Sequence, residues 1–336
     1  MATRCFWPPE RLLGVALASG GRSFPVGKVS FLDLQPMTFQ EFLNAVGDAA
    51  LADYCTQIDD LAPVPQVFAT RLEDRLKQYF ATGGMPEAVS TWCQTGDVSA
   101  VDAVLDDLLD SYERDFAKHG GASMYAKASA VWRSLPSQLA RENKKFLYGV
   151  VREGARARGY EDAIVWLEGA GLVRRVFRST APGIPVSSYD DLSAFKVYCL
   201  DVGLLRRLSR LEAGTFVDGE RMLTEFKGAF AENYVLQSLS PQLGAPPRYW
   251  SIAKPRHEVD FLAQVGNDVL PIEVKSGESI KSSSLRYYTR EFSEETPLRV
   301  RFSLRNLTLD DNLLNIPLWL ADEGVRLMGL ALAQAR

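Results

Sequence analysis

The 336-residue chain contains few cysteines and histidines, which limits the metal and redox chemistry open to it. The cysteines lie far apart, at Cys5, Cys55, Cys93 and Cys199. Because no two of them form a C-x-x-C pair, the sequence predicts neither a zinc ribbon nor a dithiol redox site. Two histidines, His119 and His257, are too few for a histidine-rich metal site. Scattered thiols in a long chain are typical of a reducing cytosol, so we expect a cytoplasmic protein.

The chain also lacks an apolar run of the roughly 20 residues that a membrane-spanning helix needs, so no membrane partner is expected. A shorter apolar run at residues 12–18 follows Arg4 and Arg11 and loosely resembles a signal peptide. Pro8 and Pro9 interrupt the basic stretch before it. We therefore interpret the run as the edge of a buried core.

A phosphate-binding loop for ATP is missing as well. The motif Val-Gly-Lys at residues 26–28 resembles the end of such a loop, but the full pattern needs Gly at position 22 and Ser or Thr at position 29. The chain has Arg22 and Val29 there. A phosphate loop also follows a strand and opens a helix, whereas residues 22–34 alternate like a strand. ATP is therefore not expected as a cofactor of this chain.

The net charge of −4 conceals two segments of opposite sign. Residues 41–116 carry a net charge of −11, and residues 117–210 carry +8. A change of sign this large between neighbouring segments indicates separate surfaces with different partners. The alternative is that the acidic and basic segments face each other.

The first half of the chain reads as mostly helical. Thr38 and Glu41 have the spacing of a capping box that opens a helix, and a further helix is expected through Arg71–Phe80. The turn at residues 83–86 (GGMP) then breaks the chain. Beyond it, apolar residues spaced for one helix face alternate with acidic residues that we expect to be solvated: Asp102, Asp106, Asp107 and Asp110.

Residues 146–200 predict two helices followed by a two-stranded ribbon, which is the plan of a winged helix. The expected elements are a basic helix over 146–158, a short helix over 161–168, and strands over 172–177 and 194–200. Such a unit can place a helix in the DNA major groove while arginines contact phosphates. The candidate contacts are Arg152, Arg156, Arg158, Arg174, Arg175 and Arg178. Winged helices also serve as protein-docking modules, so both interpretations stay open.

The strongest chemical pattern is HEVDFLAQVGNDVLPIEVKSG, residues 257–277. Two alternating runs flank a Gly-Asn-Asp turn, which predicts a β-hairpin. Asp260 lies on the first strand, and Glu273 and Lys275 lie on the second. Side chains two positions apart on a strand point to the same face, so Glu273 and Lys275 share one face. The pairing register can bring Asp260 beside them.

Asp260, Glu273 and Lys275 together have the chemical groups needed for metal-dependent hydrolysis of a phosphodiester. Asp260 and Glu273 can hold Mg²⁺, and the metal acidifies a bound water. Lys275 can position that water or stabilise the transition state. Glu232, on an expected helix over 230–239, is placed to assist, while Glu258 is expected to be solvated. The alternative for Lys275 is an ion pair with Asp260 or Glu273, which would favour a binding module without catalysis.

The Asp…Glu-x-Lys hairpin resembles the core of the PD-(D/E)xK nuclease fold. The whole chain resembles the C-terminal portion of a prokaryotic family of AAA+-type ATPases with a trailing domain of unknown function. The resemblance rests on stretches spread over the chain, among them SFPVGKVSFLDLQPMTFQEFL, GGMPEAV, YEDAIVWLEGAGLV, GAFAENYVLQSL and LPIEVKSG. In that family an ATPase core precedes the SFPVGKV-like strand, so the resemblance implies either a chain truncated before its P-loop or a natural form that has dispensed with ATP hydrolysis.

The resemblance implies an α+β multidomain fold. Its expected parts are a remnant of the ATPase sheet over 1–36, a helical lid-like segment over 37–98, a winged helix over 99–212 and a PD-(D/E)xK-like α/β domain over 222–336. Asp260, Glu273, Lys275 and Glu232 match the nuclease pattern. We therefore expect a protein that acts on or binds nucleic acid, with Mg²⁺-dependent cleavage or, alternatively, DNA binding or protein docking by a degenerate nuclease fold.

Overall fold

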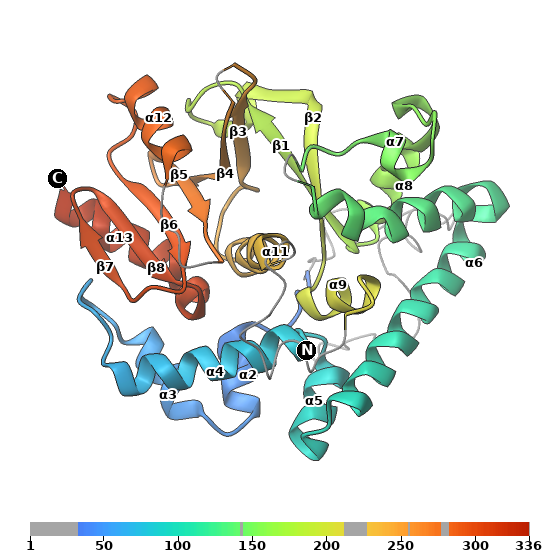
Figure 1. Ribbon diagram of the computed structural model, residues 1–336, viewed down its shortest axis with the longest axis horizontal. Helices are drawn as coiled ribbons and strands as arrows, with labels where there is room; N and C mark the ends of the chain where they lie inside the picture. The colour runs from blue at the N-terminus through green and yellow to red at the C-terminus, as the bar shows by residue number, and fades with distance from the viewer. Residues whose placement is uncertain (1–32, 142–143, 212–226, 255, 277–281, 336) are drawn as a thin grey trace, which may run out of the picture.

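The computed structural model describes residues 33–141, 144–211, 227–254, 256–276 and 282–335. Most of the strand expected over 22–34, the Val-Gly-Lys motif and the apolar run at 12–18 lie outside the described residues. The described part is an α+β protein with a helical N-terminal region followed by a mixed eight-stranded sheet with helices (Figure 1). The α+β class predicted from the sequence is confirmed.

The N-terminal region is helical, as expected. Its first helix begins after Thr38, whose Oγ1 accepts a hydrogen bond from the Glu41 amide at 3.1 Å, while the Thr38 amide donates to Glu41 Oε2 at 2.8 Å. The predicted capping box is thus confirmed. The helices are α2 (Phe39–Ala45), α3 (Ala49–Thr56), α4 (Gln66–Thr82) and α5 (Pro86–Thr95).

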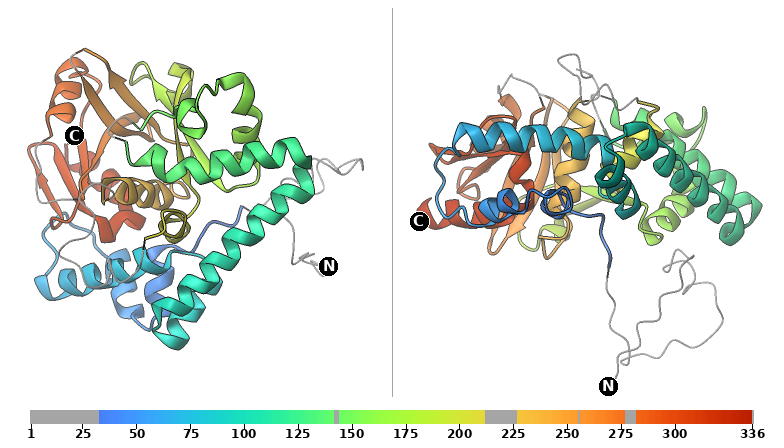
Figure 2. Two further views of the ribbon diagram at one scale, coloured as in Figure 1. Left: turned by 45° about the vertical axis from the view of Figure 1, so that its right-hand side comes forward. Right: turned by 90° about the horizontal axis from the view of Figure 1, so that it is seen from below.

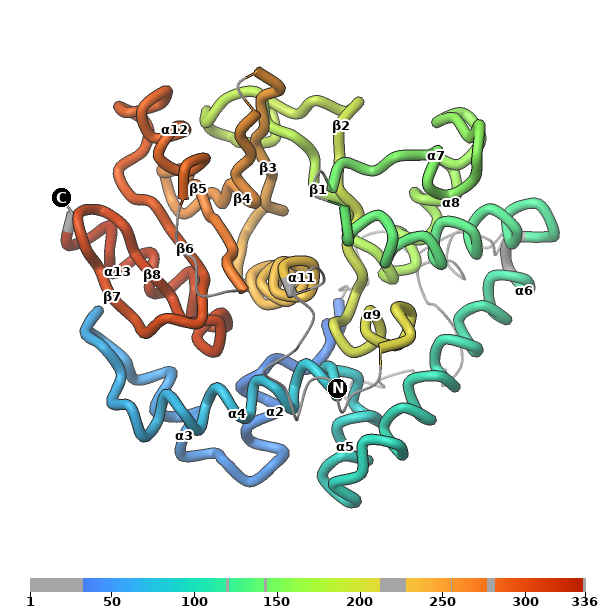
Figure 3. The backbone as a smooth tube through the Cα atoms, in the orientation of Figure 1, coloured from blue at the N-terminus to red at the C-terminus, as the bar shows by residue number. Residues whose placement is uncertain are grey.

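The long helix α6 (Val98–Leu139) bends at Gly121, which has a φ of 65°. It runs along the outside of the molecule and returns toward β2 (Asp190–Cys199) (Figure 3). The expectation that its acidic face is solvated is wrong for Asp102, whose side chain is only 20% exposed, whereas the side chain of Asp106 is 51% exposed. Asp102 pairs with Arg206 and Arg207, and Asp106 pairs with Arg207. Both arginines lie on α9 (Val202–Leu208), so part of the acidic segment does face the basic one.

The predicted basic helix over 146–158 is only the single turn α7 (Tyr148–Val151). Arg152 is extended, with φ −160° and ψ 142°, and Gly154 has a φ of 74°, so the helix ends there. The next helix, α8 (Ala157–Gly169), and the hairpin of β1 (Val173–Ser179) with β2 follow as predicted. The order helix, helix, hairpin is present, while the winged-helix assignment itself stays a prediction.

The hairpin β1–β2 belongs to the same sheet as the C-terminal strands, in the order β2-β1-β3-β4-β5-β6-β8-β7. Parallel neighbours are β1 with β3, β5 with β6 and β6 with β8, and the other pairs are antiparallel. The C-terminal strands are β3 (Arg248–Ile252), β4 (His257–Val265), β5 (Asp268–Val274), β6 (Arg299–Ser303), β7 (Thr308–Asp310) and β8 (Leu313–Pro317). One sheet therefore runs across the predicted boundary between the winged-helix and nuclease-like segments.

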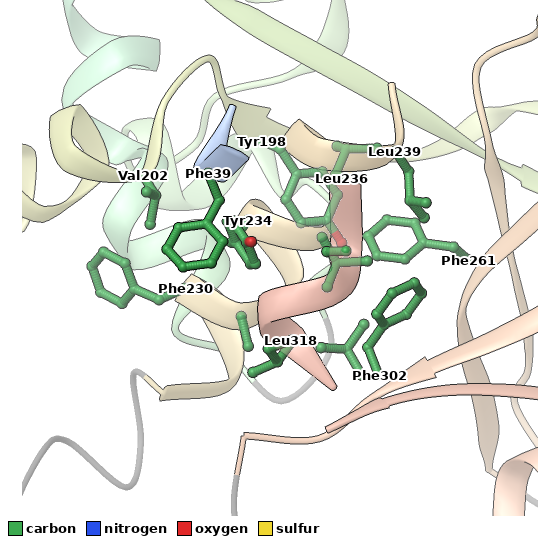
Figure 4. Packing of buried hydrophobic residues seen from close by; sticks show 14 of the residues in the cluster. Phe39, Tyr198, Val202, Phe230, Tyr234, Leu236, Leu239, Phe261, Phe302 and Leu318 are labelled. Atoms are coloured by element: carbon green, nitrogen blue, oxygen red, sulfur yellow. The ribbon is translucent and has the colours of Figure 1, made fainter. Parts of the chain in front are cut away.

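Helix α11 (Lys227–Leu239) lies near the centre of the molecule and is seen almost end-on in Figure 1. Strands lie on one side of it, and α2, α4 and α9 lie on the other. Figure 4 shows its Phe230, Tyr234 and Leu236 in the core, beside side chains from both ends of the chain such as Phe39 and Leu318. Because α11 is buried on nearly every side, its polar side chains need protein partners.

The N-terminal helices pack on the C-terminal end of the chain (Figure 2). The Gln40 amide donates to Asp322 Oδ2 at 3.0 Å, and the Val64 amide donates to Asn306 Oδ1 at 2.9 Å. Arg326 donates to the carbonyl of Ile58 at 2.5 Å. The remaining C-terminal elements are α12 (Ser283–Glu291), η2 (Leu318–Glu323) and α13 (Gly324–Ala335), and η1 (Val186–Tyr189) precedes β2.

In the part of the chain that the structure describes, no helix is long and apolar enough to cross a membrane. The described cysteines, Cys55, Cys93 and Cys199, are all free thiols.

Candidate functional site: a cluster of carboxylates and lysines

The predicted hairpin is present and is formed by β4 and β5. Val265 pairs with Asp268 across the two-residue turn Gly266-Asn267, and Gly266 has a φ of 60°. This positive φ explains why glycine opens the turn. The hairpin prediction from alternation and turn residues is confirmed.

Asp260 lies where β4 is irregular. Arg248 and Trp250 of β3 are two residues apart, but their partners on β4, Leu262 and Val259, are three apart. The extra residue is a β-bulge, a feature that redirects a side chain. At this point Asp260 Oδ2 accepts a hydrogen bond from the Val274 amide at 2.8 Å. Asp260 therefore links the end of β5 to β4 through its side chain.

Glu273 and Lys275 form an ion pair. Lys275 Nζ lies 2.6 Å from Glu273 Oε1, and the Ser282 hydroxyl donates to Glu273 Oε2. Glu273 is buried, and Lys275 is about one-third exposed, at 31% of its side chain. This is the ion pair that the sequence left open as the alternative to a water-positioning role for Lys275.

Glu232 on α11 has both of its carboxylate oxygens engaged. Lys144, in the segment between α6 and α7, donates to Oε1, and the Tyr198 hydroxyl of β2 donates to Oε2 at 3.1 Å. The side chain of Glu232 is 6% exposed and that of Lys144 is 13% exposed. The structure thus brings Glu232 to the hairpin, with a lysine partner that the sequence did not indicate.

Lys196 is a further member of the site that sequence reasoning missed. It lies on β2 with no side-chain exposure, and its Nζ is 2.5 Å from Glu258 Oε1 and 4.8 Å from the centre of the Tyr249 ring. Glu258 is therefore an ion-pair partner, not the solvated residue that we expected. A lysine inside the apolar strand AFKVYCL was the available signal, because an isolated charge within a buried strand needs a partner.

The charges of these residues act on one another. Burial, followed by the charge of Glu232, raises the pKa of Asp260 to about 7. Burial also raises the pKa of Glu232, but Lys144 and Lys196 outweigh it and hold that pKa below its usual value. For Lys196, burial lowers the pKa, but the surrounding carboxylates raise it above its usual value. The four carboxylates and three lysines therefore form one electrostatic unit, called here the carboxylate–lysine cluster: Glu232, Glu258, Asp260, Glu273, Lys144, Lys196 and Lys275.

As these side chains are placed, most of the carboxylate oxygens of the cluster are not free to hold a magnesium ion. Mg²⁺ needs oxygen ligands in a near-octahedral set around one point. Among the residues that the structure describes, no group of three or more His, Cys, Asp or Glu side chains is placed to hold a metal. The oxygens of Glu232 and Glu273 are engaged by lysines and hydroxyls, and Oδ2 of Asp260 is engaged by an amide. Asp260 and Glu273 lie on adjacent strands as predicted, but one oxygen of Asp260 and both oxygens of Glu273 bind other partners.

The six candidate arginines divide into two groups. Arg174 donates to the Leu200 carbonyl, Arg175 pairs with Glu161 and Glu168, and Arg178 pairs with Asp191. By contrast, the other three are exposed around the start of α8: Arg152, Arg156 and Arg158. The first group therefore holds the β1–β2 hairpin in place, and the second group is accessible to a ligand.

Two segments of the chain match models of protein families. Residues 73–215 match a domain of unknown function (DUF8612), and residues 227–320 match another domain of unknown function (DUF4143). The second of these domains is known from AAA-family ATPase proteins, and no P-loop region is identified by the matches. Neither family has an assigned function. No curated protein and no solved structure gives a significant match.

The carboxylate–lysine cluster is formed where the two matched segments contact each other in the fold. Its carboxylates all come from residues 227–320, whereas Lys144 and Lys196 come from residues 73–215. The cluster is thus built by both segments.

Proposed function

We propose that this chain binds nucleic acid through the phosphate backbone. The observation that carries the proposal is the exposed trio Arg152, Arg156 and Arg158 around the start of α8. Glu153 is the only acidic residue between positions 144 and 158, so this stretch is strongly basic. Exposed guanidinium groups pair well with phosphate oxygens, and phosphate contacts supply most of the non-specific affinity for nucleic acid.

The order of elements in the C-terminal half supports the same proposal. Helix α11 is followed by the antiparallel strands β3, β4 and β5, then by α12 and by β6, which is parallel to β5. Asp260 on β4 and Glu273 on β5 lie on adjacent strands of this unit, and Lys275 directly follows β5. This arrangement resembles the nuclease-like core expected from the sequence, and such cores are built to accommodate a nucleic-acid backbone.

Binding without cleavage is the form of the proposal that the geometry favours. Both oxygens of Glu232, both oxygens of Glu273 and one oxygen of Asp260 are engaged by internal donors, and Lys275 is held by Glu273. In the wider protein context, the match to a domain known from AAA-family ATPase proteins supports a chain that works beside an ATPase core. ATP binding by this chain is not part of the proposal.

The test is a DNA-binding titration at several salt concentrations. We compare wild type with Arg152→Ala plus Arg156→Ala, and use Lys77→Ala plus Arg114→Ala as a control that removes two exposed charges elsewhere. Each phosphate contact contributes about 0.9 to the slope of log affinity against log salt. The arginine variant should lose about 2 from this slope, and the control should match wild type. An unchanged arginine variant would instead favour protein docking.

A second candidate function is Mg²⁺-dependent phosphodiester cleavage. The observation that favours it is the placement of Asp260, Glu273 and Lys275 at one end of the hairpin, with Glu232 facing them from α11. A cleavage assay on single- and double-stranded DNA separates it from simple binding. Cleavage that requires Mg²⁺ and disappears in both Asp260→Ala and Lys275→Ala would establish this candidate.

A further inference from the structure

A lysine side chain with no solvent exposure stays charged only where neighbouring groups stabilise its ammonium group. Moving an ammonium group out of water is unfavourable by several kcal/mol unless carboxylates or a ring face compensate for the lost hydration. Lys196 has both kinds of partner, because Glu258 lies 2.5 Å from its Nζ and the Tyr249 ring lies 4.8 Å from it. The charges of Glu232 and Asp260 also act on it. Lys196 is therefore a cation held among carboxylates.

The buried carboxylates, in turn, need nearby cations. The four carboxylates of the cluster lie close enough to influence one another. Buried carboxylates at such a distance repel one another unless a cation stands between them. Three of the four carboxylates each pair with one lysine: Glu232 with Lys144, Glu258 with Lys196 and Glu273 with Lys275. The fourth, Asp260, accepts a hydrogen bond from the Val274 amide. The lysines therefore supply a cation to each of the three paired carboxylates.

We propose that Lys144 and Lys196 are the resident cations of this site and occupy the electrostatic role that a divalent metal would otherwise take. Both lysines are contributed by the segment that precedes the C-terminal half, so the fold of one segment neutralises the acidic site of the other. The site consequently needs no divalent metal, and removing one of these lysines should create an affinity for one. This inference does not depend on nucleic-acid binding, and either can fail alone.

The experiment measures Mn²⁺ binding to the full chain by the loss of the free Mn²⁺ electron paramagnetic resonance signal. Wild type is compared with Lys144→Ala and with Lys196→Met, which keeps the volume of the buried side chain. Lys77→Ala removes an exposed lysine and serves as the charge-matched control. Circular dichroism establishes that each variant is folded. Lys144→Gln, which keeps a hydrogen-bond donor for Glu232, replaces any variant that does not fold.

The expected result is no saturable Mn²⁺ binding by wild type or Lys77→Ala. A folded Lys144 or Lys196 variant should bind about one ion per chain, since one vacated position offers oxygen ligands to one ion. Adding Asp260→Asn should abolish that binding. Two results would overturn the proposal. One is a stoichiometric Mn²⁺ site in wild type that Asp260→Asn removes, and the other is a folded lysine variant with no Mn²⁺ binding.

Discussion

At the scale of single residues, the site is defined by which charges find a partner inside the protein. The pattern Asp…Glu-x-Lys was readable because strand alternation predicts that Glu273 and Lys275 share a face, and the two side chains do meet, although β5 ends at Val274. Lys144 and Lys196 could not be assigned in the same way, since each meets its carboxylate partner far away along the chain. Sequence spacing predicts neighbours within an element and across a tight turn, but not contacts that depend on how the sheet and α11 pack.

Asp260 should make stability depend on pH. Its folded-state pKa of about 7 lies above the value of about 3.9 in an unfolded chain, so the folded protein binds the proton more tightly. The stabilisation from this proton is complete below about pH 4 and is lost as the pH rises through about 7. Asp260→Asn mimics the protonated form and should remove that loss.

Denaturant unfolding at pH 5 and pH 8 measures this effect. Wild type should lose more stability than Asp260→Asn between the two pH values, by a few kcal/mol at most. Asp107→Asn changes an exposed carboxylate on α6 and should behave as wild type does. Equal pH dependence in wild type and Asp260→Asn would mean that Asp260 titrates near its ordinary value.

At the scale of elements, α11 is held in the core by its polar side chains as much as by its apolar ones. Asn233 accepts a hydrogen bond from the Cys199 amide at 2.9 Å and donates to the Cys199 carbonyl at 3.2 Å. Gln237 accepts from the Val202 amide at 3.0 Å and donates to the Tyr79 hydroxyl at 2.9 Å. These bonds fix α11 against β2, α9 and α4.

Removing one of these side-chain hydrogen bonds should destabilise the protein by more than the loss of a few atoms suggests, because the buried backbone partners are left unsatisfied. Asn233→Ala leaves a buried amide and a buried carbonyl of Cys199 without partners, and each unsatisfied group costs about 1–3 kcal/mol. Thermal or denaturant unfolding should show a loss of about 3 kcal/mol. Gln94→Ala removes an amide from an exposed part of α5 and should change stability by less than about 0.5 kcal/mol. Similar losses in the two variants would contradict the role given to Asn233.

The turn after α4 gives a second prediction for elements. Gly83 and Gly47 both have positive φ values, 75° and 83°, but only Gly83 is crowded. A Cβ on Gly83 would lie 2.3 Å from Asp201 Oδ1 and 2.8 Å from the Cα of Gly203, whereas a Cβ on Gly47 meets nothing within 4 Å. Gly47→Ala should lose only the backbone term of about 1–2 kcal/mol.

Gly83→Ala should lose clearly more than Gly47→Ala, since the backbone of α9 must also move and since Gly83, with a ψ of −171°, occupies a region essentially restricted to glycine. Unfolding in denaturant measures both losses on the same scale. Equal losses would show that the approach of α4 to α9 tolerates a methyl group. The GGMP turn was predicted from its residues alone, while the crowding at Gly83 depends on α9, which lies much later in the chain.

At the scale of the whole molecule, the charges of the acidic and basic segments fall into two groups. Some opposite charges meet across the fold, as Arg206 and Arg207 meet the acidic side of α6. Others remain on the surface, as the exposed arginines near α8 do. The α+β class was implied by the family resemblance, and the hairpin and the capping box followed from local patterns. The joining of β1 to β3 did not, because a single sheet formed by distant segments leaves no periodic signal in either segment.

The two matched segments should unfold as one cooperative unit. They share a sheet, the contacts of α11 and the carboxylate–lysine cluster, and the N-terminal helices bind the C-terminal end through Gln40 and Asp322. Hydrogen exchange under increasing denaturant should show residues 73–215 and residues 227–320 losing protection together. Loss of protection in one segment while the other stays protected would show that they are independent domains.

We propose that the chain binds nucleic acid by its exposed arginines and does so without a metal. The most direct test is the binding of a labelled DNA duplex in the presence of EDTA, at several salt concentrations, by wild type and by Arg152→Ala plus Arg156→Ala. We expect salt-dependent binding by wild type that persists in EDTA, with a salt slope lower by about 2 in the variant. Binding that disappears in EDTA, or that is unchanged in the variant, would contradict this proposal.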